Sequence, residues 1–230
     1  MLSEIRNHRE LKKFSFSRGA GLFGVADISG IKEDFQLLPD ITKSLSRAVC
    51  LGVGLSRCVL SEIDREPTKL YFHHYRTANM FLDQMAFAVM NWIQDRGFSA
   101  LPIPASQIVD WDLQKAHVSH KKIGHLAGLG WIGRNNLLVS KKFGAQFRLV
   151  TVLTDMKLKV DRPVINDCGS CSLCASVCPV GAIQENPEDF KHLVCFEKLK
   201  QFQRQNIVGQ FICGVCVKAC GRKDSIGHRA

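Results

Sequence analysis

The chain has 230 residues, of which 46% are hydrophobic and 23% charged, and its formal net charge is +10. This balance is typical of a globular protein with a real core, and the length allows one sizeable domain and a smaller one. No apolar run is long enough to span a bilayer and the N-terminus lacks a signal-peptide core, so we expect a cytoplasmic protein without a membrane span. Ten cysteines in such a protein favour metal or redox chemistry over disulfides.

The first half of the chain predicts helices alternating with strands. Apolar residues at helical spacing predict a helix over residues 2–17, and the run GLFGVADI predicts a strand. A continuous apolar pattern predicts a buried strand over 47–55. Within and after it, Cys50 and Cys58 have no partner at ligand spacing, and we interpret both as structural.

The longest predicted helix covers residues 67–97, with Pro67 in its first turn and Gly97 at its end. Apolar residues recur along it at steps of three and four, which predicts one buried face. The residues expected on this face are Phe81, Met85, Ala88, Val89, Trp92 and Ile93.

A glycine-rich loop follows in the middle of the chain. A short strand over 98–104 and a helix over 120–127, capped by Ser119, precede the loop AGLGWIGRNNLLV at 127–139. Three glycines in six residues would let the backbone press against a flat ligand, and a tight structural turn explains them equally well. A buried strand is expected over 147–153, after which the chain enters the cysteine-rich region.

Eight of the cysteines form two groups after residue 160. The first group reads Cys168-x2-Cys171-x2-Cys174-x3-Cys178-Pro179, the bacterial spacing that holds 4Fe–4S clusters and whose fourth cysteine binds the other cluster. Such a tightly turned loop can direct three sulfurs to adjacent corners of one cube. The second group comprises Cys195, Cys213, Cys216 and Cys220.

Two cubane clusters need eight thiolates, and the crossed pairing of two-cluster ferredoxins divides these cysteines. Cluster I is assigned Cys168, Cys171, Cys174 and Cys220, and cluster II is assigned Cys178, Cys195, Cys213 and Cys216. The second run ends in Cys220-Gly221, without the proline that follows Cys178. A disulfide framework would suit a short secreted chain, and zinc ribbons use paired C-x2-C hooks, so neither alternative matches this spacing.

The positive charge is partly offset by such clusters. Two oxidised clusters with their thiolates would lower the net charge to about +6. A balance that remains basic favours an anionic partner, such as RNA, a phosphate-bearing cofactor or an acidic electron donor, and a merely soluble surface explains it equally well.

The order and spacing of four segments resemble the epoxyqueuosine reductase family. They are HLAGLGWIGRNNLLV, FRLVTVLTDMKL, CGSCSLCASVCPVGAI and ICGVCVKAC, with the lone Cys195 between the last two. The resemblance covers about residues 108–220 and implies a cobalamin-dependent reductase related to reductive dehalogenases. It implies an α+β fold: a nitroreductase-like or cobalamin-domain-like α/β sandwich over 1–158, then a bacterial ferredoxin-like domain over 159–230.

The same resemblance implies roles for individual residues. Asp110, in IVDW, resembles the family's acidic proton donor, with Asp112 as a rival because the spacing to the glycine loop is longer here. The residues that match the loop lying against the corrin are Gly128, Gly130, Trp131, Gly133, Arg134 and Asn135. The chain stops soon after Cys220, where tRNA-acting members continue into a helical repeat region.

Three functions follow as hypotheses. The first is an iron–sulfur, cobalamin-binding reductase of an unidentified substrate, supplied by an electron donor such as ferredoxin or flavodoxin. The second is an electron-transfer or corrinoid-activating protein without its own substrate. The third, less favoured because the repeat region is missing, is epoxyqueuosine reductase acting on tRNA.

Overall fold

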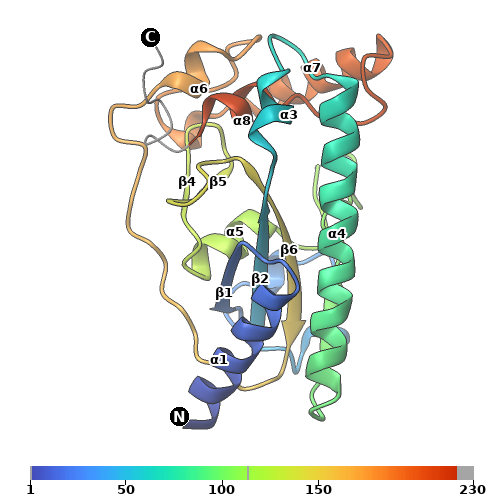
Figure 1. Cartoon of the computed structure of the whole chain (residues 1–230), viewed down its shortest axis with the longest axis vertical. Coiled ribbons are helices and arrows are strands. Elements are labelled where there is room, and N and C mark those ends of the chain that lie inside the picture. Colours follow the sequence, from blue (N-terminus) through green and yellow to red (C-terminus); the bar gives the residue numbers. More distant parts are fainter. Residues whose placement is uncertain (1, 113, 222–230) are drawn as a thin grey trace. The chain divides into compact units, whose positions relative to one another are not determined.

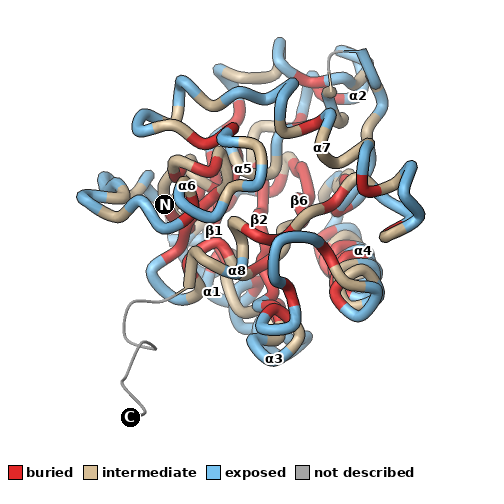
Figure 2. The backbone as a smooth tube through the Cα atoms, turned by 90° about the horizontal axis from the view of Figure 1, so that it is seen from above, coloured by how far each residue is buried: buried red, intermediate tan, exposed pale blue. Residues whose placement is uncertain are grey.

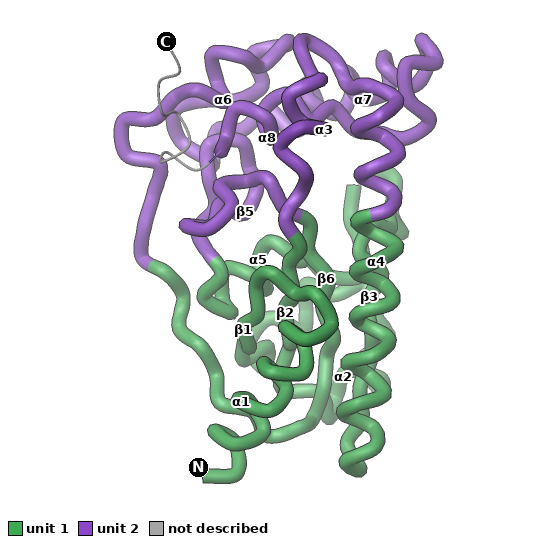
Figure 3. Tube along the Cα trace, viewed as in Figure 1, with its two compact units in different colours: residues 1–53, 78–129, 148–164 green, residues 54–77, 130–147, 165–230 purple. Residues whose placement is uncertain are grey.

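The computed structural model describes residues 2–112 and 114–221 and divides into two compact units (Figure 3). Unit 1 consists of Met1–Val53, Ala78–Leu129 and Arg148–Val164, and unit 2 consists of Gly54–Thr77, Gly130–Phe147 and Ile165–Ala230. The sequence suggested a division at 158/159. The last segment of unit 1 ends close to that point, and unit 2 recruits two earlier segments of the chain.

A four-stranded sheet in the order β1-β2-β6-β3 forms the centre of unit 1 (Figure 1). Its strands are β1 (Leu22–Asp27), β2 (Arg47–Gly54), β6 (Phe147–Thr154) and β3 (Ala100–Ile103). β1 pairs antiparallel with β2, and β3 pairs antiparallel with β6. β2 and β6 are almost continuously buried, as Figure 2 shows in red. The four strands expected from the apolar runs are therefore confirmed.

Helices cover both faces of this sheet. α1 (Leu2–Ser17) packs the His8 ring edge-on against Phe23, with ring centroids 5.3 Å apart. A side chain at the next residue, Gly24, would place its Cβ 2.2 Å from the carbonyl oxygen of Ala127, which caps α5 (His120–Leu126). Because successive strand residues point to opposite faces, α1 and α5 lie on opposite sides of the sheet.

The long helix α4 (Lys69–Gln94) begins two residues later than expected. Thr68 caps it by accepting a hydrogen bond from the Tyr71 amide at 3.1 Å, so Pro67 precedes the helix instead of lying in its first turn. At the other end, Gly97 adopts a φ of +81° just beyond the helix, as its expected role as a stop requires.

The buried face of α4 is shifted around the helix from the expected face by one row of side chains. Met85, Val89 and Ile93 are buried as predicted, but Phe81 is 41% exposed, and Ala88 and Trp92 are half-buried. The buried positions that the expectation missed are Ala78, Leu82 and Ala86. A helix turns about 100° per residue, so two neighbouring apolar rows share members and periodicity alone does not choose between them.

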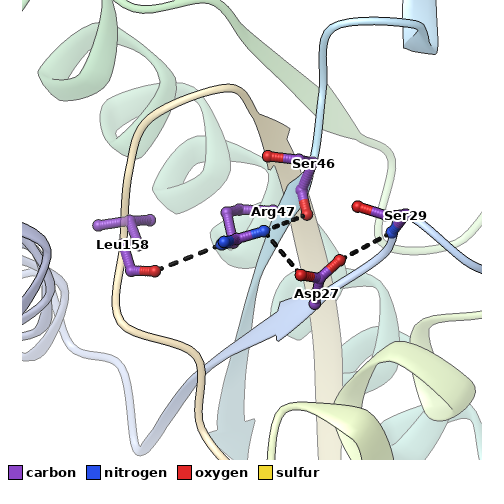
Figure 4. A network of polar contacts seen from close by, with 5 residues as sticks. All are labelled: Asp27, Ser29, Ser46, Arg47 and Leu158. Atoms are coloured by element: carbon purple, nitrogen blue, oxygen red, sulfur yellow. Dashed lines mark hydrogen bonds and ion pairs between the residues drawn. The ribbon is translucent and has the colours of Figure 1, made fainter. Parts of the chain in front are cut away.

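A polar network connects the edge of the sheet to the irregular segment that follows β6 (Figure 4). Arg47 donates to the Asp27 carboxylate at 2.9 Å and to the Leu158 carbonyl at 3.3 Å. The Ser29 amide donates to the other oxygen of Asp27 and lowers the pKa of that carboxyl group. Because the ion pair between Arg47 and Asp27 is partly exposed, its main effect is to fix the path of the backbone at this edge of the sheet.

The remaining elements are short. In unit 1 they are η1 (Lys32–Asp34) and α2 (Pro39–Thr42), and in unit 2 they are α3 (Arg57–Ser61), β4 (Trp131–Ile132), β5 (Leu138–Val139), α6 (Leu173–Ser176), η2 (Pro187–Asp189), α7 (His192–Arg204) and α8 (Val215–Ala219). β4 and β5 form an antiparallel hairpin where the sequence suggested only a loop. Within residues 2–112 and 114–221, no helix has the length and apolar character needed to cross a membrane.

Candidate iron–sulfur site

The first cysteine run lies on a turn that leads into α6. The Cys171 amide donates to the Cys168 carbonyl at 3.0 Å, and Gly169 between them adopts a φ of +52°. Cys174 lies within α6 and is 7% exposed, and Cys178 follows the helix. The fourth cysteine is thus separated from the first three along the chain by the end of α6, and the division of the thiols between two clusters stays a prediction.

The second group comes from three different elements of unit 2. Cys195 lies in α7, Cys216 lies in α8 and Cys220 caps the end of α8. Cys213 precedes Gly214, which caps the start of α8 with a φ of +84°. A Cβ at position 214 would lie 2.5 Å from the Tyr71 ring, so this position accommodates only glycine.

The thiols influence one another in two sets. Burial, together with the neighbouring thiols of Cys174, Cys168 and Cys171, raises the pKa of Cys220 to about 11. This set matches cluster I and joins the last cysteine of the chain to the first three of the first run. Burial is also the main cause of the raised pKa of Cys174, followed by Cys168 and Cys171.

The other set matches cluster II. Burial, together with the thiols of Cys213 and Cys178, raises the pKa of Cys195 to about 11. Burial followed by Cys213 and Cys195 also raises the pKa of Cys216, to which Cys174 of the first set contributes as well. The two sets are therefore neighbours. Thiolates crowded in this way need a compensating positive charge, which iron would supply.

Backbone amides add donors to the sulfurs. The Ala182 amide donates to Cys178 Sγ at 3.3 Å. Hydrogen bonds from the Val215 and Ala145 amides oppose the rise in the pKa of Cys213 and Cys220. Such donors stabilise thiolates and the sulfur of a bound cluster. Within the described ranges, no three His, Cys, Asp or Glu side chains could hold a single metal ion, whereas cubane thiolates bind separate iron atoms.

Two segments that sequence reasoning did not connect to the cysteines support them. A Cβ at Gly144 would lie 2.1 Å from the Cys220 carbonyl oxygen, and the Ala145 amide donates to that oxygen at 2.9 Å. Lys218 donates to the carbonyls of Ser61 and Ile63 after α3. No spacing rule links these segments to a cysteine motif. The only signal in the sequence is the glycine in KKFGA.

The glycine-rich loop forms the turn of the β4–β5 hairpin and the segment before it. A Cβ at Gly130 would lie 2.0 Å from the Val139 carbonyl oxygen, and one at Gly128 would lie 2.5 Å from the Arg162 carbonyl oxygen. These glycines are thus explained by close approach of the chain's own backbone. Contact of the loop with a corrin remains a prediction.

Three residues of the hairpin turn face the first cysteine run. Arg134 donates to the carbonyls of Cys171 at 2.7 Å and Gly169 at 2.9 Å. A Cβ at Gly133 would lie 3.4 Å from Cys168 Sγ and 3.1 Å from Asn135 Oδ1. Arg134 and Asn135 were expected at a cofactor, and the structure brings them to the residues proposed to bind cluster I.

The proposed proton donor lies in a different unit. Asp110 pairs in an isolated bridge with Lys115, and its amide donates to the Lys115 carbonyl at 3.1 Å. Asp110 is half-buried, whereas its rival Asp112 and the intervening Trp111 are exposed. Of the two carboxyl groups, that of Asp110 is the less exposed, and its role as a proton donor remains a prediction.

An open cavity of about 760 Å³ lies beside the hairpin in unit 2. Its lining residues are Ile132, Asn136, Asn186, Pro187, Glu188, Asp189 and Phe190. Asn186 donates to the Asp189 carboxylate at 3.2 Å, which holds η2 in place at the rim. Carboxylates and amides on one wall would suit a polar or cationic group more than an anion.

Comparison with curated proteins finds epoxyqueuosine reductases. The enzyme of Aliivibrio fischeri is 43% identical over 74 residues, which are 32% of this chain and 20% of that protein. The enzyme of Pseudomonas aeruginosa is 30% identical over 155 residues, which are 64% of this chain and 39% of that protein. The chain thus matches well under half the length of these relatives. No protein-family model matches the sequence.

Solved structures give the same two families. A catabolic reductive dehalogenase in complex with 3-bromo-4-hydroxybenzoic acid matches 94% of this chain and 32% of its own, with a TM-score of 0.73 and 19% identity. The epoxyqueuosine reductase of Streptococcus thermophilus matches 96% of this chain and 67% of its own, with a TM-score of 0.64 and 16% identity. Further matches are a reductive dehalogenase described with a mechanism for B12-dependent dehalogenation and an epoxyqueuosine reductase with a tRNA stem loop.

At these identities the solved structures establish the fold, and the curated proteins establish the sequence relationship. The chain is therefore a mixed α/β protein related in sequence to the epoxyqueuosine reductases and similar in fold to these enzymes and to reductive dehalogenases.

Proposed function

We propose that this chain is an iron–sulfur oxidoreductase that resembles epoxyqueuosine reductase. Two 4Fe–4S clusters would relay electrons to a bound cobalamin, at which an unidentified substrate is reduced. The observation that supports this best is the division of eight thiols into two interacting sets of four. In this proposal unit 1 corresponds to the cobalamin-domain-like α/β sandwich, and the cysteine-rich region to a ferredoxin-like domain.

Each cofactor would supply a different part of the chemistry: the clusters one-electron steps, and cobalamin a strongly reducing cobalt centre. Four thiolates would hold each cluster, with Cys168 among the ligands of cluster I and Cys178 among those of cluster II. Backbone amides, such as that of Ala182, would stabilise the sulfurs. The glycine loop with Trp131 is proposed to lie against the corrin. A buried donor of that loop, Trp131 Nε1, has no protein partner, which suits a polar ligand.

Asp110 would supply the proton. The reductive cleavage of a carbon–oxygen bond takes two electrons and two protons. The leaving oxygen would take one proton from a carboxyl oxygen of Asp110, and the second proton would come from solvent. Solvent would return the proton to Asp110. Asp110 is half-buried and is therefore a better candidate for this role than the exposed Asp112.

The test is an anaerobic preparation, reconstituted with iron and sulfide and titrated with cobalamin, followed by visible absorption and EPR spectroscopy. About eight irons per chain together with a bound corrinoid are the expected result, since two cubane clusters contain that number. Eight irons without corrinoid would support the electron-transfer alternative. Fewer than four irons would contradict both.

A tRNA substrate is tested separately. One solved relative holds a tRNA stem loop, and the net charge of +10 would attract phosphates. If tRNA is the substrate, its affinity should fall steeply between about 50 and 200 mM salt because phosphate contacts release counterions. Equal affinity for an unrelated RNA of the same length would assign the binding to charge alone.

A further inference from the structure

Two buried side-chain donors stand out in the described part of the chain because they have no hydrogen-bond partner. They are Trp131 Nε1 and Asn135 Nδ2, and both belong to the β4–β5 hairpin. Asn135 is only 4% exposed, and its other amide atom, Oδ1, already accepts from the Leu137 amide at 3.3 Å. A buried amide donor without an acceptor costs about 1–3 kcal/mol, so an acceptor outside the protein chain is to be expected.

The atoms around Gly133 indicate where we expect that acceptor to lie. The empty Cβ position of Gly133 borders Asn135 Oδ1 at 3.1 Å and Cys168 Sγ at 3.4 Å. The side-chain oxygen of Asn135 and the Cys168 sulfur therefore border the same position, where Gly133 has no side chain. The same position lies 2.6 Å from Val139 Cγ2, so any larger residue would force the amide and the sulfur apart.

Arg134 brings a positive charge to the turn that carries the first cysteine run. Its guanidinium group holds two carbonyls of the turn that carries the first run, those of Cys171 and Gly169. A planar fork suits two carbonyl acceptors, and the charge stays on the group at any physiological pH. No carboxylate lies within ion-pair distance of Arg134 in the described structure.

We infer that the hairpin turn Gly133-Arg134-Asn135 sets the reduction potential of cluster I. Asn135 Nδ2 would donate a hydrogen bond to a sulfur of the cluster, and Arg134 would supply charge and fix the ligand turn. This inference rests on the proposed function, because it requires a cluster at Cys168, Cys171, Cys174 and Cys220. It assigns to Arg134 and Asn135 a role toward iron–sulfur chemistry in addition to any role toward a corrin.

The sign of the effect follows from charge. Reduction adds one electron to an anionic cluster, so a positive charge and a donated hydrogen bond stabilise the reduced form more than the oxidised form. Both residues therefore raise the potential of cluster I. Cluster II lies against other elements, α7 and α8, and should be less affected.

The experiment is a redox titration of the reconstituted full-length chain, followed by EPR. Arg134→Gln and Asn135→Asp should each lower the reduced-to-oxidised ratio of cluster I about tenfold at a fixed solution potential, which is 59 mV for a one-electron couple. Asn135→Asp keeps the oxygen that accepts from Leu137, removes the donor and adds a negative charge, so a variant that adds the same charge elsewhere is needed as its control. Arg134→Lys keeps the charge and should recover most of the loss.

Matched controls carry the same chemical changes elsewhere in unit 2. Arg204→Gln alters an exposed arginine at the end of α7, and Asn136→Asp alters a residue that lines the open cavity. Both should change the ratio by less than about threefold because solvent screens these charges. Cys220→Ala and Cys195→Ala assign the EPR signals to cluster I and cluster II.

Each outcome of the redox titration either supports or contradicts this inference. Absence of clusters in the unmodified chain would contradict the proposed function and this inference with it. Intact clusters whose potentials do not change in Asn135→Asp and Arg134→Gln would overturn this inference alone, as would equal shifts in the control variants. If Arg134→Gln fails to assemble cluster I, Asn135→Asp still decides through the potential.

Discussion

The two units of this chain are stabilised in different ways. Unit 1 contains a sheet with two almost fully buried strands, β2 and β6, and a long helix with a continuous buried face. The last segment of unit 2, from Ile165 on, contains helices of four and five residues besides α7, and its cysteines are mostly half-exposed. From this difference we expect unit 1 to be held together by hydrophobic burial, and the segment of unit 2 that carries the cysteines to depend in addition on what its thiols bind.

Removal of the iron should therefore have the largest effect, and only on unit 2. Chelation under mild oxidation is expected to abolish amide hydrogen-exchange protection in α6 and α8, because metal binding supplies folding free energy to small cysteine-rich regions. β2 and β6 should keep their protection and serve as the internal control. Equal loss in both units would show that the contrast between them is wrong.

Single cysteines should separate the two clusters. Cys220→Ala is expected to remove about half of the iron and the EPR signal of cluster I, although Cys220 lies in the second group, because its thiol interacts with the first run. Cys58→Ala, an exposed cysteine outside both groups, should keep all the iron and is the control. Loss of the cluster II signal alone would rule out the crossed pairing.

Two glycines with almost the same backbone conformation test close packing. Gly97→Ala in unit 1 faces only the cost of its φ of +81°, about 1–2 kcal/mol, because a Cβ there meets no atom within 4 Å. Gly214→Ala has a similar φ of +84° and would also meet the Tyr71 ring at 2.5 Å. We expect it to cost more and to reduce cluster II assembly, as measured by iron content and thermal unfolding. Equal effects would mean that Tyr71 moves aside.

The last expected effect is a pH dependence of unit 1, which is fully developed only well below neutral pH. The His120 ring donates from Nε2 to the Pro104 carbonyl at 2.9 Å, and its Nδ1 lies 2.8 Å from Thr151 Oγ1. Burial lowers the pKa of His120 from 6.5 to about 4. The unfolded chain then binds the proton more readily, so stability falls as the pH drops from 6.5 toward 4, by at most about 3 kcal/mol.

Urea unfolding of unit 1 at pH 7 and pH 4.5 would measure this dependence. His120→Gln should flatten it, because the amide keeps hydrogen-bonding atoms but binds no proton. The exposed His73 provides the control, since His73→Gln should leave the pH dependence unchanged. A profile that His120→Gln does not alter would assign the dependence to other groups.

Features that depend on local order along the chain could be predicted from the sequence. The spacing of Cys168, Cys171, Cys174 and Cys178 predicted a tightly turned loop, since three-residue steps restrict the course of a backbone. Likewise, the continuous apolar run at residues 47–55 predicted β2, and Ser119 predicted the start of α5.

Features that join distant residues were decided only by the tertiary structure. Periodicity allowed two neighbouring rows of α4, and packing selected the row with Leu82 instead of the row with Phe81. Arg134 reached the carbonyls of the first cysteine run, and Tyr71 dictated a glycine at position 214, across separations that no motif records. The physical reason is that spacing along a chain limits local geometry, whereas close packing chooses among the partners that this geometry leaves open.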